Sequence, residues 1–159
     1  MAFATTKQGD QIYYSSTGSG PTALVFVHGW MGSGVWWDQQ RDHFASDYTC
    51  VQLDLEGHGK SDKTRKARSV LAYAEDIAAV VEHARVKNAI LIGHSMSGSN
   101  VVEAAALLPQ VSGLILVDTL HNLDEMMTSE KAQSFLDMLR NNYDETIKNV
   151  LPNFLIVSS

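Results

Sequence analysis

The chain has 159 residues, of which 45% are hydrophobic, and its 18 acidic side chains outnumber 12 basic ones. This length and composition fit one globular domain with a sizeable apolar core. The net charge of −6 and the lack of a basic stripe exclude an ordinary nucleic-acid-binding domain, so we expect no nucleic-acid partner.

The first third of the chain predicts a hairpin, a strand and a helix. Residues 3–16 read as a β-hairpin, because Gly9 and Asp10 can form the turn before a returning strand. The continuous apolar run at 22–27 is typical of a parallel strand covered on both faces. A glycine-rich loop follows, and residues 35–45 have helical character.

The middle of the chain predicts a strand over 48–55, a polar loop over 56–68 and a helix over 69–85. Ser69 is placed to cap the start of that helix. The loop carries a short basic cluster broken by Asp62, which we interpret as solvated rather than as an anion site. The basic residues of the cluster are Lys60, Lys63, Arg65, Lys66 and Arg68.

Two further buried strands are predicted over 88–92 and 113–117, on either side of a helix over 97–108. Strands that alternate with helices form parallel sheets with right-handed crossovers. The sequence therefore predicts an α/β fold with a mostly parallel sheet flanked by helices.

The sequence changes character after Asp118. Residues 126–143 predict an amphipathic helix, and residues 146–151 predict a second, shorter one. We therefore divide the chain into a core, residues 1–118, and a helical part, residues 119–159.

Three motifs follow apolar strands in a fixed order. They are Phe26-Val27-His28-Gly29-Trp30, Leu53-Asp54-Leu55-Glu56-Gly57-His58-Gly59-Lys60-Ser61 and Gly93-His94-Ser95-Met96-Ser97-Gly98. In the third, a serine lies between small residues at a strand-to-helix junction, as in a nucleophile elbow. Together the motifs resemble the α/β-hydrolase family over roughly residues 10–120. The resemblance implies an N-terminal α/β-hydrolase core without its C-terminal strands, followed by the start of a helical cap that is apparently truncated.

Ser95 is the candidate nucleophile. A serine hydroxyl is weakly nucleophilic at neutral pH and needs an adjacent base. Ser97 is the alternative, because it also lies between small residues, although the strand ends too early to favour it. In this family a serine, rather than an aspartate, favours acyl transfer.

Two backbone N–H groups are candidates for an oxyanion hole. The N–H of Met96 should point toward the reaction centre, because it lies at the start of a helix. The resemblance implies that the N–H of Trp30 is the second donor. We place His28, Gly29 and His94 around the substrate pocket, with His28 bracing the oxyanion loop.

The general base and its acid are harder to place. The family order is serine, then aspartate or glutamate, then histidine. Asp118 is the candidate acid, because it lies at the end of a strand. His121 is the only histidine after Ser95, at a position that the family does not use for its base. Three explanations stay open: a fragment of a longer protein, a site completed by another chain, or a short form without triad chemistry.

We predict a serine hydrolase that acts on small carboxylic esters. The alternative is a non-catalytic, hydrolase-like protein that binds a ligand or a partner. Neither an H-E-x-x-H spacing nor a G-x-G-x-x-G loop after a strand occurs, so we expect no metal and no other cofactor.

The strand at 113–117 raises the question of partners. By the family's strand order its far edge would be bare, and a bare apolar edge invites pairing. We expect this edge to associate with a missing C-terminal segment or with a second copy of the chain.

The sequence also predicts where the protein is found. Cys50 is the only cysteine, so no intrachain disulfide can form. Residues 1–6 lack the features of a secretory signal, and no apolar run approaches the roughly 18 residues of a membrane span. We therefore expect a cytoplasmic protein.

Overall fold

The computed structural model describes residues 1–119, 129–142, 144, 145 and 148. The chain forms two compact units, Met1–Leu120 and His121–Ser159. The first unit contains a six-stranded sheet with its helices, and the second contains α4 (Ser129–Asn141).

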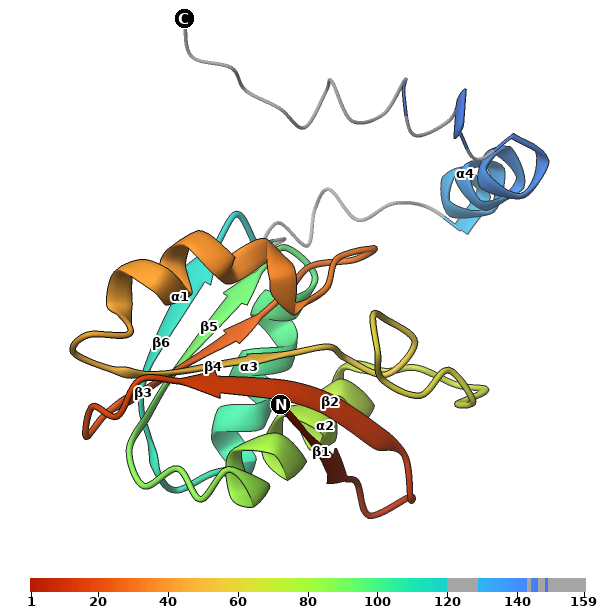
Figure 1. The fold of residues 1–159 in the computed structure, drawn as a ribbon. Coiled ribbons are helices and arrows are strands. Elements are labelled where there is room, and N and C mark those ends of the chain that lie inside the picture. The colour runs from red at the N-terminus through yellow and green to blue at the C-terminus, as the bar shows by residue number, and fades with distance from the viewer. Residues whose placement is uncertain (120–128, 143, 146–147, 149–159) are drawn as a thin grey trace, which may run out of the picture. The chain divides into compact units, whose positions relative to one another are not determined.

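The sheet has the strand order β1-β2-β4-β3-β5-β6 (Figure 1). Its strands are β1 (Ala2–Thr5), β2 (Gln11–Thr17), β3 (Ala23–Val27), β4 (Thr49–Leu53), β5 (Ala89–His94) and β6 (Val111–Val117). β3 pairs in parallel with β4 and β5, and β5 pairs in parallel with β6, whereas β1 and β2 add to one edge in antiparallel fashion. The predicted α/β fold with a mostly parallel sheet is therefore confirmed.

Helices cover both faces of this sheet. They are the 3₁₀ turn η1 (Gly34–Trp37), α1 (Asp38–Phe44), α2 (Val70–His83) and α3 (Ser97–Leu107). Figure 1 shows α1 on one face and α2 and α3 on the other. Successive side chains of β3 point to opposite faces of the sheet, so they pack against the helices on both faces. Val25 and Val27 belong to the core that includes α2 and α3, whereas Leu24 and Phe26 pack with Trp37 of η1.

Several local signals work as the sequence predicts. Gly9 adopts a φ of +95° in the turn between β1 and β2, a conformation that glycine reaches without strain. The hydroxyl of Ser69 accepts the N–H of Ala72 at 3.1 Å and so caps α2. Cys50 is fully buried in β4.

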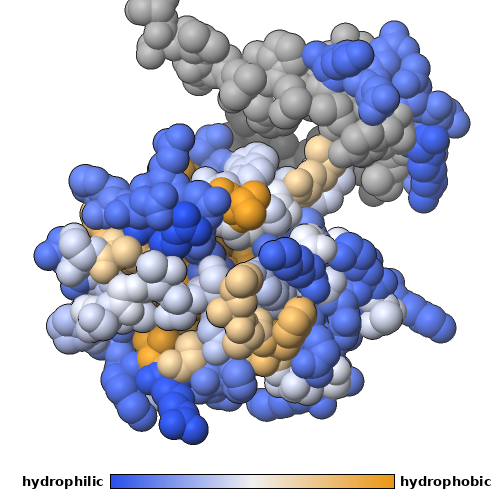
Figure 2. Space-filling model, in the orientation of Figure 1, coloured by the Kyte–Doolittle hydropathy of each residue, from blue (hydrophilic) through white to orange (hydrophobic). Residues whose placement is uncertain are grey.

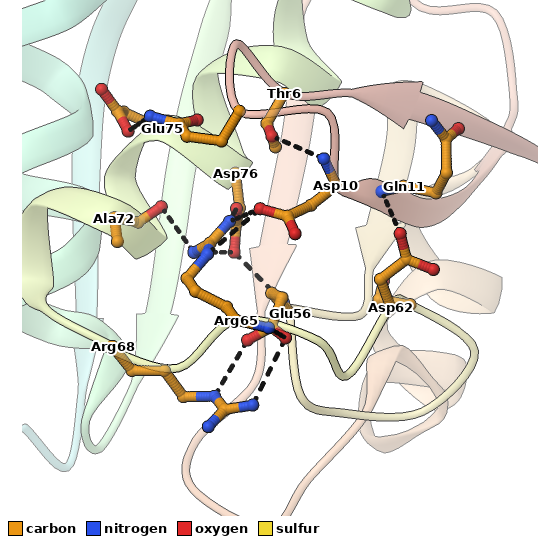
Figure 3. Close-up of polar contacts among 12 residues, drawn as sticks. Thr6, Asp10, Gln11, Glu56, Asp62, Arg65, Arg68, Ala72, Glu75 and Asp76 are labelled. Atoms are coloured by element: carbon orange, nitrogen blue, oxygen red, sulfur yellow. Dashed lines mark hydrogen bonds and ion pairs between the residues drawn. The ribbon is translucent and has the colours of Figure 1, made fainter.

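In the loop after β4, four of the five basic residues of the cluster are exposed, as predicted, and Arg65 is the exception. Arg65 is 12% exposed and lies between the carboxylates of Asp10 and Asp76, each 2.7 Å from its guanidinium (Figure 3). Arg68 makes a 2.9 Å contact with the fully buried Glu56. Burial raises the pKa of Asp76 to about 6, although the hydrogen bond from Arg65 opposes that shift. The local pattern missed these contacts because the acids come from three places: Asp10 from the hairpin turn, Glu56 from the start of the same loop and Asp76 from α2.

β6 lies at the edge of the sheet, and the prediction of a buried strand over 113–117 was wrong. Among the described strands it pairs with β5 alone. Its last apolar residues are between 38% and 47% exposed. They are Leu114, Ile115, Leu116 and Val117. Each would gain from contact with further apolar surface.

The second unit is described by α4 and a few residues after it. α4 falls within the helix predicted over 126–143, whereas most of the helix predicted over 146–151 lies outside the described residues. The assignment of this unit to a cap stays a prediction.

One face of the described surface is seen in Figure 2. In the orientation of Figure 2 it is mostly hydrophilic, with apolar surface in small patches. None of the helices in the described ranges is long and apolar enough to cross a membrane.

Candidate active site

Ser95 lies in a sharp bend between the end of β5 and the start of α3. Its φ is +51°, in the left-handed region that residues with a side chain rarely adopt. Two backbone hydrogen bonds hold the bend, one from the Ser95 N–H to Val117 O and one from the Gly98 N–H to Ser95 O, both 3.0 Å long. Such a backbone typically costs about 1–3 kcal/mol and persists only where its surroundings enforce it.

Small residues make this bend possible. A Cβ atom at Gly93 would overlap the carbonyl oxygen of Ser97. A Cβ at Gly29 would lie 2.8 Å from Nδ1 of His94 and 3.1 Å from Cβ of Ser95. The absence of a side chain at Gly93 therefore permits the bend, and its absence at Gly29 permits the loop after β3 to pack directly against Ser95.

The hydroxyl of Ser97 is committed to the fold. It is buried and donates a 2.6 Å hydrogen bond to the carbonyl oxygen of His28, while it accepts from Nδ2 of Asn100 at 3.3 Å. The Ser97 hydroxyl is thus buried and occupied by hydrogen bonds within the fold, and Ser95 stays the predicted nucleophile.

His28 is fully buried at the end of β3, and both its ring nitrogens are hydrogen-bonded. Nε2 accepts the N–H of Leu55 at 3.1 Å, so Nδ1 carries the proton that is donated to Gly29 O at 2.7 Å. Burial lowers the pKa of His28 to about 4, with the hydrogen bond to Gly29 opposing. His28 therefore supports the loop from behind, and its place around the substrate pocket stays a prediction.

The same contact orients the peptide between Gly29 and Trp30. The Gly29 carbonyl accepts from His28 and also from the N–H of Gly32 at 3.1 Å. In a trans peptide the following N–H points the opposite way. The N–H of Trp30 is therefore directed away from the ring of His28. The Trp30 side chain is 47% exposed.

Met96 lies directly before α3, which has 11 residues. The first N–H groups of a helix have no partner within it and favour a negative charge. The Met96 N–H is thus placed beside Ser95 at a helix N-terminus, as the sequence predicts.

His94 lies beside two tryptophans. Its ring centroid is 5.7 Å from that of Trp36 and 6.4 Å from that of Trp37. The buried Nδ1 of His94 has no hydrogen-bond partner among the described residues. Trp37 packs on Phe26 with ring centroids 5.3 Å apart, whereas Trp36 is 57% exposed. His94 and Trp36 thus connect the bend at Ser95 to an exposed aromatic surface.

Asp118 and Ser95 follow the C-terminal ends of two neighbouring parallel strands, β6 and β5. His94 pairs with Val117, so Ser95 and Asp118 are the residues that immediately follow each strand. Asp118 has a φ of +46°. Met31 has a φ of +59°, so it is the third non-glycine residue with a left-handed backbone, after Ser95 and Asp118, in the loops that follow the C-terminal ends of the parallel strands. The structure brings the predicted serine and acid to one region, whereas His121 lies outside the described residues.

Asp54 is a residue of this region to which the sequence analysis gave no role. It follows β4, and its carboxylate accepts backbone N–H groups from two loops. Its place in the second motif was the available signal. Within the part of the chain that the structure describes, no three histidine, cysteine or carboxylate side chains are grouped so that they could hold a metal ion.

Known proteins resemble this chain over most of its length. The sequence model described as the alpha/beta hydrolase fold matches residues 22–156. A bifunctional esterase/perhydrolase of Acinetobacter calcoaceticus is 36% identical over 111 residues, which cover 69% of this chain and 40% of that protein. A non-heme chloroperoxidase of Burkholderia pyrrocinia is 36% identical over 117 residues, which cover 72% of this chain and 42% of the chloroperoxidase. The chain thus spans about 40% of the length of these curated relatives.

Solved structures share the fold. An esterase from Exiguobacterium antarcticum superposes with a TM-score of 0.85 at 24% identity, covering 93% of this chain and 59% of the esterase. An esterase from a Rhodococcus species has a TM-score of 0.68 at 35% identity, and the match covers 76% of this chain and 46% of the esterase. The first similarity concerns the fold alone.

Proposed function

Since the chain belongs to the alpha/beta hydrolase family, we propose that Ser95 is the nucleophile of a serine hydrolase acting on small carboxylic esters. The left-handed bend at Ser95, packed against Gly29 and followed by α3, is the observation that carries the proposal. It supports a hydroxyl presented beside two backbone N–H groups, which is what acyl transfer requires.

The reaction begins with attack of Ser95 Oγ on the ester carbonyl carbon, while a general base takes the hydroxyl proton. The carbonyl oxygen becomes an oxyanion, which the N–H groups of Met96 and Trp30 stabilise. Removal of one such donor typically costs about 3 kcal/mol of transition-state stabilisation. The alcohol then leaves with the proton from the base, and water releases the acid from the acyl-serine.

The base belongs to a part of the protein outside the described residues. Asp118 is our candidate for the acid that orients it, because it lies beside Ser95 at the ends of β5 and β6. The base then comes from the segment that contains His121, from a further segment of a longer protein, or from a second chain at the β6 edge.

The name of one curated relative supports the substrate class. A relative that covers 69% of this chain is named an esterase/perhydrolase, so small esters are the first substrates to test. The non-catalytic alternative predicts a ligand bound in the same place without acylation of Ser95.

The test supplies the base from solution. The chain is mixed with 4-nitrophenyl acetate at a series of imidazole concentrations, and the acyl-enzyme is detected by mass spectrometry. We expect acylation that depends on imidazole, that Ser95→Ala abolishes and that Ser99→Ala retains, because Ser99 is exposed one turn along the same segment. Acylation that survives Ser95→Ala would contradict the assignment, and binding of the ester without acylation would favour the non-catalytic alternative.

A further inference from the structure

Asp54 follows β4 and is 5% exposed. Its Oδ1 accepts the N–H of Gly34 at 2.7 Å, and its Oδ2 accepts the N–H of Lys60 at 2.8 Å. We propose that Asp54 is a positioning residue, whose carboxylate ties the loop after β3 to the loop after β4 and thereby fixes the N–H of Trp30. This inference rests on the proposed function of that N–H as an oxyanion donor.

The two loops close tightly around the carboxylate. Gly59 has a φ of +47°, and a Cβ there would overlap Oδ2 of Asp54. A Cβ on Gly34 would lie 3.4 Å from Oδ1. The ammonium group of Lys60 is directed elsewhere, 4.6 Å from the centre of the Tyr13 ring. The Asp54 carboxylate is therefore held by backbone N–H groups, which form stronger hydrogen bonds to an ionised acceptor than to a neutral one.

The main chain of Asp54 is fixed as firmly as its side chain. Its N–H donates to Tyr13 O at 2.9 Å, and its carbonyl accepts the hydroxyl of Ser61 at 2.5 Å. The same hydroxyl accepts the N–H of Tyr13 at 2.8 Å. Asp54 is thus anchored to the sheet, so it can hold two loops in place rather than move with them.

The loop that carries Trp30 is held at both ends. Gly29 is fixed by the ring of His28, and Gly34 is fixed by Asp54. Between them lies Met31, whose φ of +59° is unfavourable for a residue with a side chain. A strained loop of this kind relaxes when an anchor is removed, and the N–H of Trp30 then loses its fixed direction.

Two substitutions remove the anchor from opposite sides. Asp54→Asn leaves one acceptor oxygen where two N–H groups need one each. Gly34→Pro removes the donated N–H and places the ring Cδ where that hydrogen faced Oδ1, so the loop after β3 is separated from the carboxylate. The preceding backbone is compatible with proline, because Gly34 is the first residue of η1 and Ser33 before it is extended, with φ −155° and ψ 173°.

Each variant has a matched control. Gly34→Ala keeps the N–H and adds a Cβ with contacts of 3.3–3.4 Å. Asp62→Asn alters a carboxylate on the same loop that accepts one backbone N–H, that of Gln11 at 2.8 Å (Figure 3). That contact lies on β2 and does not involve the loop after β3.

The experiment measures amide hydrogen exchange over residues 29–33 and the imidazole-dependent acylation of Ser95 by 4-nitrophenyl acetate. We expect Asp54→Asn and Gly34→Pro to speed exchange at 29–33 by about 10-fold, since local opening becomes easier. The maximal rate of acylation should fall about 10-fold while the ester concentration at half-maximal rate changes less than about twofold. Both controls should behave like the wild type.

Measuring both exchange and acylation distinguishes a failure of the positioning role of Asp54 from a failure of the proposed hydrolase function. Unchanged exchange at 29–33 in Gly34→Pro overturns the inference, even if Asp54→Asn fails to fold. Faster exchange with unchanged acylation shows that Asp54 joins the loops without positioning the donor, and also overturns it. If the wild type is not acylated at all, the proposed function fails, and exchange alone decides whether Asp54 holds the loop.

Discussion

The hydroxyl of Ser97 donates a 2.6 Å hydrogen bond to the carbonyl oxygen of His28. This contact joins the start of α3 to the end of β3 in a fully buried position. It links the helix that follows Ser95 to the loop that carries Trp30, so the two proposed oxyanion donors are held by one structural connection.

Replacement of Ser97 by alanine tests this link. The variant leaves the carbonyl of His28 unpaired in the interior, so we expect the free energy of unfolding to fall by about 1–3 kcal/mol. Urea denaturation measures the loss. Ser99→Ala on the exposed face of α3 is the control and should change stability by less than about 0.5 kcal/mol. Equal stabilities of the two variants would contradict the role given to Ser97.

His28 predicts a pH dependence of stability. Burial lowers its folded-state pKa to about 4, below the ordinary value of 6.5. Between these pH values the unfolded chain takes up a proton that the folded chain does not. The contribution of His28 to the free energy of unfolding is therefore fully present above pH 6.5. It is lost as the pH falls toward 4, and the total loss is about 3 kcal/mol.

The measurement compares wild type with His28→Asn by denaturation across this pH range. Asp76 acts in the opposite sense, because burial raises its pKa to about 6 and its folded carboxyl binds a proton first. Its contribution is common to both proteins, so the difference between them isolates His28. A histidine signal for residue 28 that titrates near its ordinary pKa in NMR would contradict the prediction.

The ion cluster of Arg65 predicts a large effect of a single substitution. Arg65→Met would leave the buried carboxylate of Asp76 and that of Asp10 without their cation. Removal of one partner from a buried pair typically costs about 3–5 kcal/mol. Chemical denaturation should show that loss, while Lys66→Met on the exposed part of the loop should stay within about 0.5 kcal/mol. A small effect of Arg65→Met would show that solvent screens the cluster.

The β6 edge predicts association. Leu114 and Leu116 are 40% and 39% exposed on a strand that pairs on one side in the described structure. We expect the 159-residue chain to form oligomers in light scattering, and the double lysine substitution of these leucines to reduce them, because charges disfavour edge pairing. A monodisperse wild-type monomer would count against this account.

The sequence predicted the features that depend on neighbouring residues. Strands such as 22–27, the cap at Ser69 and the bend at Ser95 follow from local polarity, small residues and turn chemistry. The parallel order of the strands follows from their alternation with helices. These signals place the loop that carries Ser95 and the loop that carries Trp30 together at the C-terminal ends of the parallel strands.

The features that the sequence did not predict depend on residues far apart in the chain. Arg65 meets Asp10 across 55 positions, and Asp54 meets Gly34 across 20. The exposure of Leu116 depends on which strand covers β6, which no local pattern contains. The charge pattern of the loop after β4 therefore predicted the exposure of four of its basic residues but not the ion pairs of Arg65, whose partners lie on other elements.

The central claim is that Ser95 carries the acyl group, and the most direct test is to map the site of a covalent label. The chain is treated with a fluorophosphonate probe in the presence of imidazole, digested, and sequenced by mass spectrometry. We predict a label on Ser95 that is lost in Ser95→Ala and retained in Ser99→Ala. A label on another serine, with Ser95 unmodified in the folded and imidazole-supplied protein, would contradict the claim.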